Sequence, residues 1–325
     1  MKYLKWSFAA LTLFAAFSVQ AQSPSLAWPT RPVRVVLGFN AGGPSDIVMR
    51  AVANRLSSAW GQPVVIENKP GGNEIVAALD VIRQPPDGYT LVLATDSTFS
   101  LNPLLRSKLG YDVNRDFAPI TRVSQGQLML FVRPDFPASN LKDFIGYAKS
   151  NPGKLNYAST GTGGIMHLAT SWLSKLYGLD MAHIVYTGVP PVLQDITASR
   201  VDATLLAAGP PMPYVQAGKL KAIAVTGPSR VRIAPQVPTF AESGYPDYDA
   251  FYYFGLAAPA GTPAPILNRI ADDVAKVMKD SEIVKLVESM GLQPMNDTPS
   301  EFAAFLAKDK VEAGKRVAAA NLKIE

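Results

Sequence analysis

The chain contains no cysteine and only two histidines among its 325 residues. Without cysteine there is no disulfide framework, no thiolate metal site and no lipidated N-terminal cysteine. The histidines, His167 and His183, lack the H-E-x-x-H spacing of a zinc site. We therefore expect neither a metal nor a cofactor. We interpret His167 as a structural residue that orients its loop, with a hydrogen bond to a ligand as the alternative, and His183 as a core or edge residue.

Sequence motifs for nucleophilic or nucleotide chemistry are also missing. There is no G-x-S-x-G elbow and no G-x-x-x-x-G-K-[ST] loop, and Met166 stands where the glycine run at Gly161 would need its third Gly or Ala. The net charge of +5 includes no basic block, which excludes nucleic acid as a partner. The pattern favours recognition over bond breaking, although Asp46 and Asp96 leave acid-base chemistry open as an alternative.

The N-terminus has the features of a secretory leader. Lys2 and Lys5 precede a 14-residue apolar run that ends at Val19, and Ala21 completes a signal-peptidase site. A membrane span needs roughly 20 apolar residues, and every later apolar run is broken by a charge, proline or glycine. We predict cleavage after Ala21 and a periplasmic protein that is free of the membrane.

A glycine-rich turn between a strand and a helix opens the mature chain. The β-branched run over residues 33–39 predicts a strand, and Pro44 with Ser45 marks a helix that ends near residue 60. Gly42 and Gly43 allow the backbone to approach a ligand closely. The free N–H groups of the helix then favour an anion such as a carboxylate. An ordinary capped turn is the alternative.

The following segments continue the α/β alternation. Strands are expected over residues 64–67 and 89–94, with a helix over 75–82 between them. The third strand ends at a polar segment that contains Ser97 and Thr98. Ligands of open α/β sheets bind at this edge, so this segment is a third candidate wall of the site.

A second unit repeats the same pattern. A helix over 141–150 and a strand over 155–158 lead into the loop from Ser159 to Gly164, which a helix over 167–177 follows. Strands over 182–186, 203–206 and 220–226 complete a doubly wound unit. Two glycine loops that face each other would form a cleft.

Two extended segments are predicted to connect the units. Strand material over 117–123 and 128–132, with a crossing at 125–127, leads out of the first unit, and the aromatic strand 251–258 returns to it. The predicted organisation is a signal peptide over 1–21, a first domain of 28–126 plus 253–325, and a second domain of 127–252. On the return strand the aromatic side chains alternate, with core packing as the default and Tyr253 as the candidate for the cleft.

The ordered motifs of the mature chain resemble the Bug-type solute receptors of tripartite tricarboxylate transporters over almost its whole length. The segments that carry the resemblance are WPTRPVRVVLGFNAGGPSD, GQPVVIENKPGG, PDGYTL, LNPLL, DFAPIT, PGKLNYASTGTGG with HLA, DMAHIVYTG, AGKLKAIAVTG, VPTFAESG, FGLAAPAGTP and TPSEFAAF. The resemblance implies a two-domain periplasmic binding protein of the type II (Venus flytrap) class.

The resemblance also implies that two facing loops grip a ligand carboxylate. The first loop would contribute Phe39, Ala41, Gly42, Gly43 and Asp46, and the second Ser159, Thr160, Gly161, Thr162 and Gly163. Ser97 and Thr98 would line the same cleft. Compared with the family pattern, Gly164 removes a hydroxyl, and Ile165 and Met166 make the mouth more apolar.

The function implied is capture of a small carboxylate, aromatic or otherwise less polar than citrate, by a monomeric receptor that delivers it to membrane permease subunits. Two alternatives remain open at this point. One is a co-receptor that reports ligand to a sensor kinase. The other is a periplasmic hydrolase or lyase that uses Asp46 or Asp96 as its base.

Overall fold

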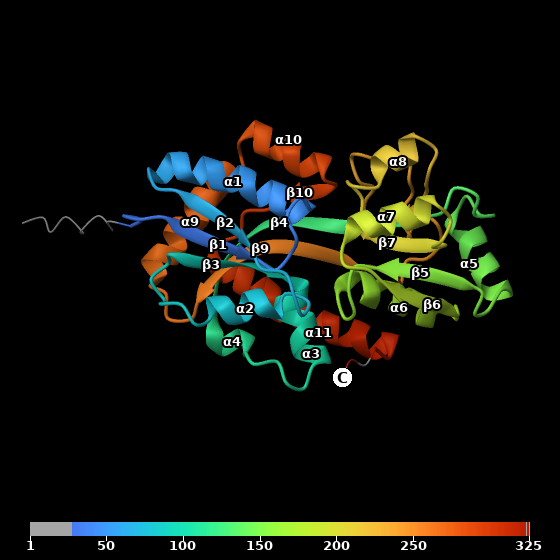
Figure 1. The fold of residues 1–325 in the computed structure, drawn as a ribbon, viewed down its shortest axis with the longest axis horizontal. Coiled ribbons are helices and arrows are strands. Elements are labelled where there is room, and N and C mark those ends of the chain that lie inside the picture. The colour runs from blue at the N-terminus through green and yellow to red at the C-terminus, as the bar shows by residue number, and fades with distance from the viewer. Residues whose placement is uncertain (1–27, 323, 325) are drawn as a thin grey trace, which may run out of the picture.

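The computed structural model describes residues 28–322 and residue 324. The predicted leader and its cleavage site lie outside these residues. Within them, no helix is both long and apolar enough to cross a bilayer. The chain forms two α/β lobes side by side (Figure 1).

The first lobe combines the N-terminal elements with the C-terminal ones. From the N-terminal part it takes β1 (Val33–Leu37), α1 (Pro44–Trp60), β2 (Val64–Asn68), α2 (Ile75–Val81), β3 (Thr90–Thr95), η1 (Ser97–Leu101), α3 (Asn102–Leu105) and α4 (Val113–Asp116). From the C-terminal part it takes β9 (Phe251–Pro259), α9 (Ala264–Val277), α10 (Ser281–Ser289), β10 (Leu292–Pro294) and α11 (Pro299–Ala320).

The second lobe is built from the middle of the chain. After β4 (Phe117–Val132) it contains α5 (Leu141–Ser150), β5 (Leu155–Ser159), α6 (Ile165–Tyr177), β6 (Met181–Val185), α7 (Val189–Thr197), β7 (Ala203–Ala207), α8 (Met212–Gln216) and β8 (Lys221–Val225). The strand, glycine loop and helix order predicted for this unit is therefore present. Helix α6 begins two residues earlier than expected, at Ile165.

One sheet path runs through both lobes in the order β2-β1-β3-β9-β4-β7-β5-β6, and β8 and β10 also pair with β4. Strand β1 is parallel to β2 and β3, and β5 is parallel to β6 and β7. The crossing strands β4 and β9 are antiparallel to each other. The parallel strands place the carboxyl ends of β1 and β3 side by side in one lobe and those of β5 and β7 in the other.

Strand β4 is a single strand of 16 residues, where the sequence predicted two shorter ones. Its residues from Phe117 to Gln127 pair with β9, and those from Leu128 to Val132 pair with β7. The polar residues near Gly126 suggested a break because they lack an apolar pattern. Their backbone groups are nevertheless paired, and the unpredicted three-residue strand β10 joins them on the other side.

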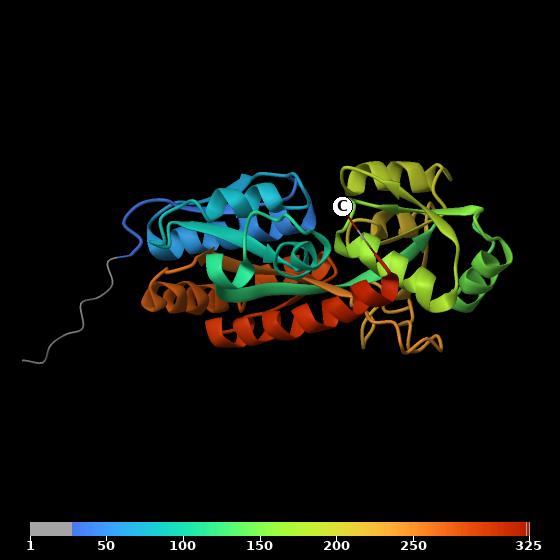
Figure 2. The same cartoon turned by 90° about the horizontal axis from the view of Figure 1, so that it is seen from below.

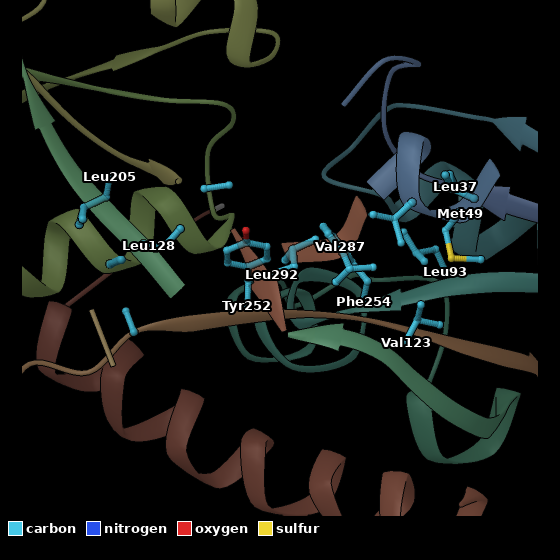
Figure 3. Close-up of a cluster of buried hydrophobic side chains, with 14 of the residues drawn as sticks. Leu37, Met49, Leu93, Val123, Leu128, Leu205, Tyr252, Phe254, Val287 and Leu292 are labelled. Atoms are coloured by element: carbon cyan, nitrogen blue, oxygen red, sulfur yellow. The ribbon is translucent and has the colours of Figure 1, made fainter. Parts of the chain in front are cut away.

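A continuous hydrophobic core connects the lobes. Leu128 and Leu205 come from the second lobe and Leu37 and Leu93 from the first, while Tyr252 and Leu292 lie between these groups (Figure 3). A second connection is α11, which runs beneath both lobes (Figure 2). Its N-terminus carries a capping box of Thr298 and Glu301.

Candidate functional site

The first glycine loop ends in a helix whose leading N–H groups have no side-chain cap. Gly42 adopts φ 85°, and Gly43 is the extended N-cap of α1 with φ −80° and ψ 169°. Such uncapped groups, together with the positive end of the helix dipole, attract anions. A Cβ added at Gly43 would meet only the carbonyl oxygen of Asn40, at 3.9 Å, so the space in front of this residue is open.

The side chain of Asp46 anchors this loop through hydrogen bonds. Its buried carboxylate accepts the Gly42 N–H at 3.0 Å, the Asn68 side-chain amide at 3.0 Å and the Arg50 guanidinium. Burial alone would raise the pKa of Asp46, but the hydrogen bonds from Arg50, Gly42 and Asn68 outweigh burial and lower it. Asp46 is therefore an ionised loop anchor whose oxygens already have partners.

The second glycine loop has the same backbone geometry. Gly163 adopts φ 86°, and Gly164 is the extended N-cap of α6 with φ −77° and ψ 171°, again without a side-chain cap. Here the anchor is His167, whose Nδ1 accepts the Gly163 N–H at 3.1 Å. The interpretation of His167 as a residue that orients the loop is confirmed.

The two histidines form a stack beneath the second loop. Their ring centroids are 3.9 Å apart, and a ring nitrogen of His183 lies 2.7 Å from the Ser159 hydroxyl. Burial, with a smaller contribution from His183, lowers the pKa of His167 to about 4. His167 is thus neutral at physiological pH and can accept at Nδ1 only if its proton is on Nε2. His183 lies on β6, at the end of the sheet path.

The third candidate wall is buried and internally bonded in this structure. Ser97 and Thr98 are buried in the π-helical turn η1, where the Thr98 N–H bonds to the Thr95 hydroxyl. The Thr98 hydroxyl donates to Glu74 at 3.0 Å, and Thr95 donates to the same oxygen. An internal carboxylate therefore accepts the hydroxyl protons of both Thr95 and Thr98.

Glu74 is a residue that the sequence did not single out. It is the residue before α2 and has a left-handed backbone conformation with φ 73°. A Cβ added at Gly38 would lie 2.6 Å from the Cβ of Glu74, so the two residues are in close contact. Burial raises the pKa of Glu74 to about 7. The only signal in the sequence was the short PGGNE entry to this helix.

The predicted loop residues differ in how accessible they are. Ala41, Gly42 and Thr162 are exposed, whereas Phe39, Gly43, Thr160 and Gly161 are half-buried and Asp46, Ser159 and Gly163 are buried. The Thr160 hydroxyl lies 3.2 Å from the sulfur of Met166. The exposed groups of both loops are therefore mainly backbone.

Each glycine loop lies close to the opposite lobe. The Asn40 side-chain amide donates to the Thr187 carbonyl at 3.2 Å. A Cβ on Gly164 would lie 3.2 Å from the Asn73 side-chain oxygen, and one on Gly163 would lie 3.7 Å from Leu105. Asn40, Asn73 and Leu105 belong to the first lobe and Thr187 and the glycines to the second, so each glycine loop lies beside residues of the opposite lobe at the junction.

An aromatic series extends from the first loop to the junction of the lobes. Phe39 packs edge-on against Phe254, and Phe254 packs edge-on against Tyr252. Tyr253 was the residue expected to reach the cleft if any did. It packs instead on the opposite face of β9, against Phe302 and Phe305, as the core-packing default predicted.

A separate cavity of about 390 Å³ lies beside the crossing strands. Its walls include Gln127, Arg230, Arg232 and Glu288, and none of the predicted ligand-binding residues lines it. Arg232 is paired with Glu288, and Arg230 with Glu242. Across the described part of the chain, no three potential metal ligands gather.

Comparison with protein families gives one match that covers most of the chain. Residues 48–322 match the model described as tripartite tricarboxylate transporter family receptor. The chain belongs to this family. Among relatives of this receptor, a UPF0065 protein of Bordetella pertussis is 32% identical over 294 residues, 90% of each chain. Another, from Cupriavidus necator, is 33% identical over 302 residues, 92% of this chain and 90% of the relative.

Solved structures of similar proteins carry the same architecture. An R. palustris protein solved with adipate is 30% identical, with a TM-score of 0.86 over 91% of this receptor and 99% of that chain. The periplasmic binding protein BugD is also 30% identical, with a TM-score of 0.83 over 92% and 100%. MatC from Rhodopseudomonas palustris, with bound malate, is 29% identical, with a TM-score of 0.82 over 89% and 100%. The predicted α/β binding-protein fold is thereby confirmed.

Proposed function

We propose that this receptor captures a small carboxylate between its two glycine loops and delivers it to a tripartite tricarboxylate-type membrane permease. The observation that carries the proposal is the pair of uncapped helix N-termini, at Gly43 and Gly164, on facing lobes. Each N-terminus is worth about 0.3 to 1 kcal/mol to a nearby negative charge, and up to about 2 where the charge is partly buried. Two such ends aimed at one carboxylate favour an anion over a neutral solute.

Closure of the lobes is the event that the permease would recognise. We place the domain boundary as the sequence suggests, with residues 28–126 and 253–325 in one domain and 127–252 in the other. Only β4 and β9 then cross the boundary, and these two strands can bend as a hinge. The ligand stabilises the closed state because only that state brings both loops to the carboxylate.

The ligand class is argued from the mouth of the second loop. The Thr160 hydroxyl is engaged by the Met166 sulfur, and Gly164 offers no hydroxyl of its own. Ile165 packs against the apolar core. These features support an acid less polar than citrate, with an aromatic or longer aliphatic body. The structural neighbours with adipate and malate support a carboxylate as the common feature.

The proposed site of action is the periplasm. The leader with cleavage after Ala21 would deliver a monomer to the periplasm, where receptors of this family act. The rival hydrolase or lyase would need Asp46 or Asp96 as its base. The oxygens of Asp46 are held by Arg50, Gly42 and Asn68, and this does not favour proton abstraction. A sensor-kinase co-receptor would use the same site and differ only in its partner.

A thermal-shift screen of the chain from Gln22 onward tests the binding proposal. The panel contains dicarboxylates, tricarboxylates, aromatic acids, amino acids and neutral sugars. A ligand at 100 times its dissociation constant adds about 2.7 kcal/mol, which raises the melting temperature by a few degrees. Shifts confined to carboxylates are the expected result. Shifts by sugars alone would overturn the proposal, and copurification with a sensor ectodomain instead of a permease would favour the co-receptor.

A further inference from the structure

Two adjacent tyrosines on β9, Tyr252 and Tyr253, have buried hydroxyls without a hydrogen-bond partner in the described part of the chain. Buried polar groups are normally paired, so each unpaired hydroxyl calls for an explanation. The two side chains point to opposite faces of the strand. Their surroundings therefore decide which of them a ligand can reach.

Tyr253 lies in the interior of the first lobe. Its ring contacts Phe302 at 6.1 Å and Phe305 at 5.0 Å between centroids, both from α11. It is fully buried and belongs to a core cluster that includes Phe99 and Ala257. No residue of either glycine loop is in that cluster.

Tyr252 lies where the lobes meet. It is the register partner of Gly126, and a Cβ on that glycine would come within 2.5 Å of the hydroxyl oxygen, so only glycine leaves room for the ring. Figure 3 shows the ring standing up from β9 between Leu128 and Leu205 of one lobe and Phe254 of the other. Its hydroxyl points away from the strand into this junction.

The aromatic series connects this hydroxyl to the carboxylate site. Phe39 follows β1 at the start of the first glycine loop, and its ring centroid is 6.1 Å from that of Phe254. The Phe254 ring is in turn 5.6 Å from that of Tyr252. The three rings form a contiguous apolar series that begins at the loop and ends at an unpaired phenol.

We propose that Tyr252 is a specificity-determining residue that donates a hydrogen bond to an uncharged acceptor at the far end of the ligand. The inference rests on the proposed function, since it assumes that the near end is a carboxylate held by the glycine loops. The ligand class is then an acid with an apolar body that lies along Phe39 and Phe254 and ends in a carbonyl, ether or hydroxyl oxygen.

The charge state of the phenol supports a neutral far end. Burial raises the pKa of Tyr252, and the nearby charge of Asp96 raises it further. The phenol therefore stays protonated and acts as a donor at physiological pH. Burial at this position also disfavours a second carboxylate, because desolvation penalises the charged form.

Titration calorimetry with matched acids tests the inference. The probes are hexanoate against 5-oxohexanoate and 4-ethylbenzoate against 4-acetylbenzoate, so that within each pair one CH₂ group is replaced by a ketone carbonyl. For the wild-type chain we expect the ketone acid to bind about tenfold more tightly, as one hydrogen bond to a buried group provides. Tyr252→Phe should lose this preference within each pair, whereas the apolar acids should bind it unchanged.

Tyr253→Phe is the matched control, because it removes an equally buried and unpaired hydroxyl from the neighbouring position. It should keep the tenfold preference. The melting temperature of ligand-free Tyr252→Phe should be equal to or above that of the wild type, since the variant removes an unpaired polar group without leaving a cavity. A residue with a merely structural role would lower it.

Three results would overturn the inference. The first is an unchanged preference in Tyr252→Phe. The second is a Tyr252→Phe variant that loses the same amount of affinity for both acids of a pair and also melts at a lower temperature. The third is a screen in which only highly charged acids such as citrate bind, which leaves the capture of a carboxylate standing but refutes both the less polar ligand class and this inference. If no carboxylate binds at all, the proposed function fails and this inference fails with it.

Discussion

The two glycine loops have nearly the same backbone and different anchors. In each, a glycine with φ near 85° precedes an extended glycine N-cap. The N–H of the first of these two glycines donates to a side chain four residues later. That side chain is the carboxylate of Asp46 in one loop and the imidazole of His167 in the other. The backbone geometry is therefore the common requirement, and the anchor can vary.

The anchors give the two helix ends different electrostatics. Asp46 places a negative charge in the first turn of α1, where it offsets part of the helix dipole. The first turn of α6 contains no acidic residue, and its anchor is neutral. The second loop therefore presents the more positive end to a ligand. We expect the second loop to contribute more of the electrostatic affinity for an anion, and the first loop to contribute more through the shape of the binding site.

The largest effect is expected from filling the first loop. Gly43→Val places a side chain where the carboxylate approaches, and its backbone angles suit any residue. Binding should fall by about 100-fold or more, which corresponds to about 2.7 kcal/mol. The free energy of unfolding should change by less than about 1 kcal/mol. Calorimetry and chemical unfolding measure the two quantities.

Gly146→Val, on the exposed face of α5, is the control and should bind normally. The same change can be made in the second loop. Gly164→Val meets the Asn73 oxygen at 3.2 Å and should cost stability as well as binding. Full affinity of Gly43→Val would contradict the placement of the site.

The pH dependence of stability should separate the anchors. The pKa of His167 is about 4 in the folded state and about 6.5 when unfolded, so the folded chain binds fewer protons between these values. The contribution of neutral His167 to the free energy of unfolding is fully present above pH 6.5. It falls by about 3 kcal/mol as the pH is lowered to 4. The stability of His167→Gln should lack this loss.

The measurement is the difference between the unfolding free energies of wild type and His167→Gln from pH 7.5 to 4. A difference is needed because Glu74 titrates in the opposite direction. Its pKa is raised to about 7, so its contribution improves stability as the pH falls over the same interval. Parallel curves for the two proteins would show that His167 does not resist protonation in the fold.

Loss of the first anchor should cost a smaller amount that is constant over this pH range. The pKa of Asp46 is lowered, so its stabilisation is present above pH 4 and lost only in stronger acid. Asp46→Asn weakens the bonds to Gly42 and Arg50 and should reduce the unfolding free energy by about 1 to 3 kcal/mol between pH 5 and 7.

The exposed Asp272 on α9 provides the control for Asp46→Asn. Asp272→Asn should stay within about 0.5 kcal/mol of the wild type. A pH-dependent loss in Asp46→Asn between pH 5 and 7 would mean that Asp46 is not held ionised as the structure indicates.

The smallest effect is expected at the contact between the lobes. Asn40→Ala removes the hydrogen bond to the Thr187 carbonyl, which is available only when the lobes meet. Affinity should fall by about threefold to tenfold, equivalent to about 0.5 to 1.5 kcal/mol. Asn54→Ala, on the exposed side of α1, is the matched control. Equal affinities of the two variants would remove Asn40 from the closing mechanism.

The strand, loop and helix order was predictable because it depends on local signals. The apolar run before Gly42, the proline after Gly43 and the glycine pair at Gly163 each determine nearby backbone conformation. Alternation along β9 was predicted for the same reason. The face on which Tyr252 lies was not, because it depends on Gly126, more than 120 residues earlier in the chain.

The burial of Glu74 could not be predicted from the sequence. Its burial results from three segments that meet in the fold, the end of β1 at Gly38, the end of β3 at Thr95 and the turn at Thr98. Nothing in the local sequence around Glu74 indicates these neighbours. For the same reason the sequence left the Ser97 and Thr98 segment open, although its hydroxyls are used within the protein.

The position of β9 between β3 and β4 determines the order in which the lobes can be completed during synthesis. Val92 pairs with Ala257, 165 positions later, so the first lobe keeps an unpaired strand edge until almost the whole chain exists. The strands β5 to β8 and their partner segment of β4 are contiguous in sequence. The lobe that is second along the chain is therefore the first that can fold, and closing the long loop to β9 is expected to be the slow step.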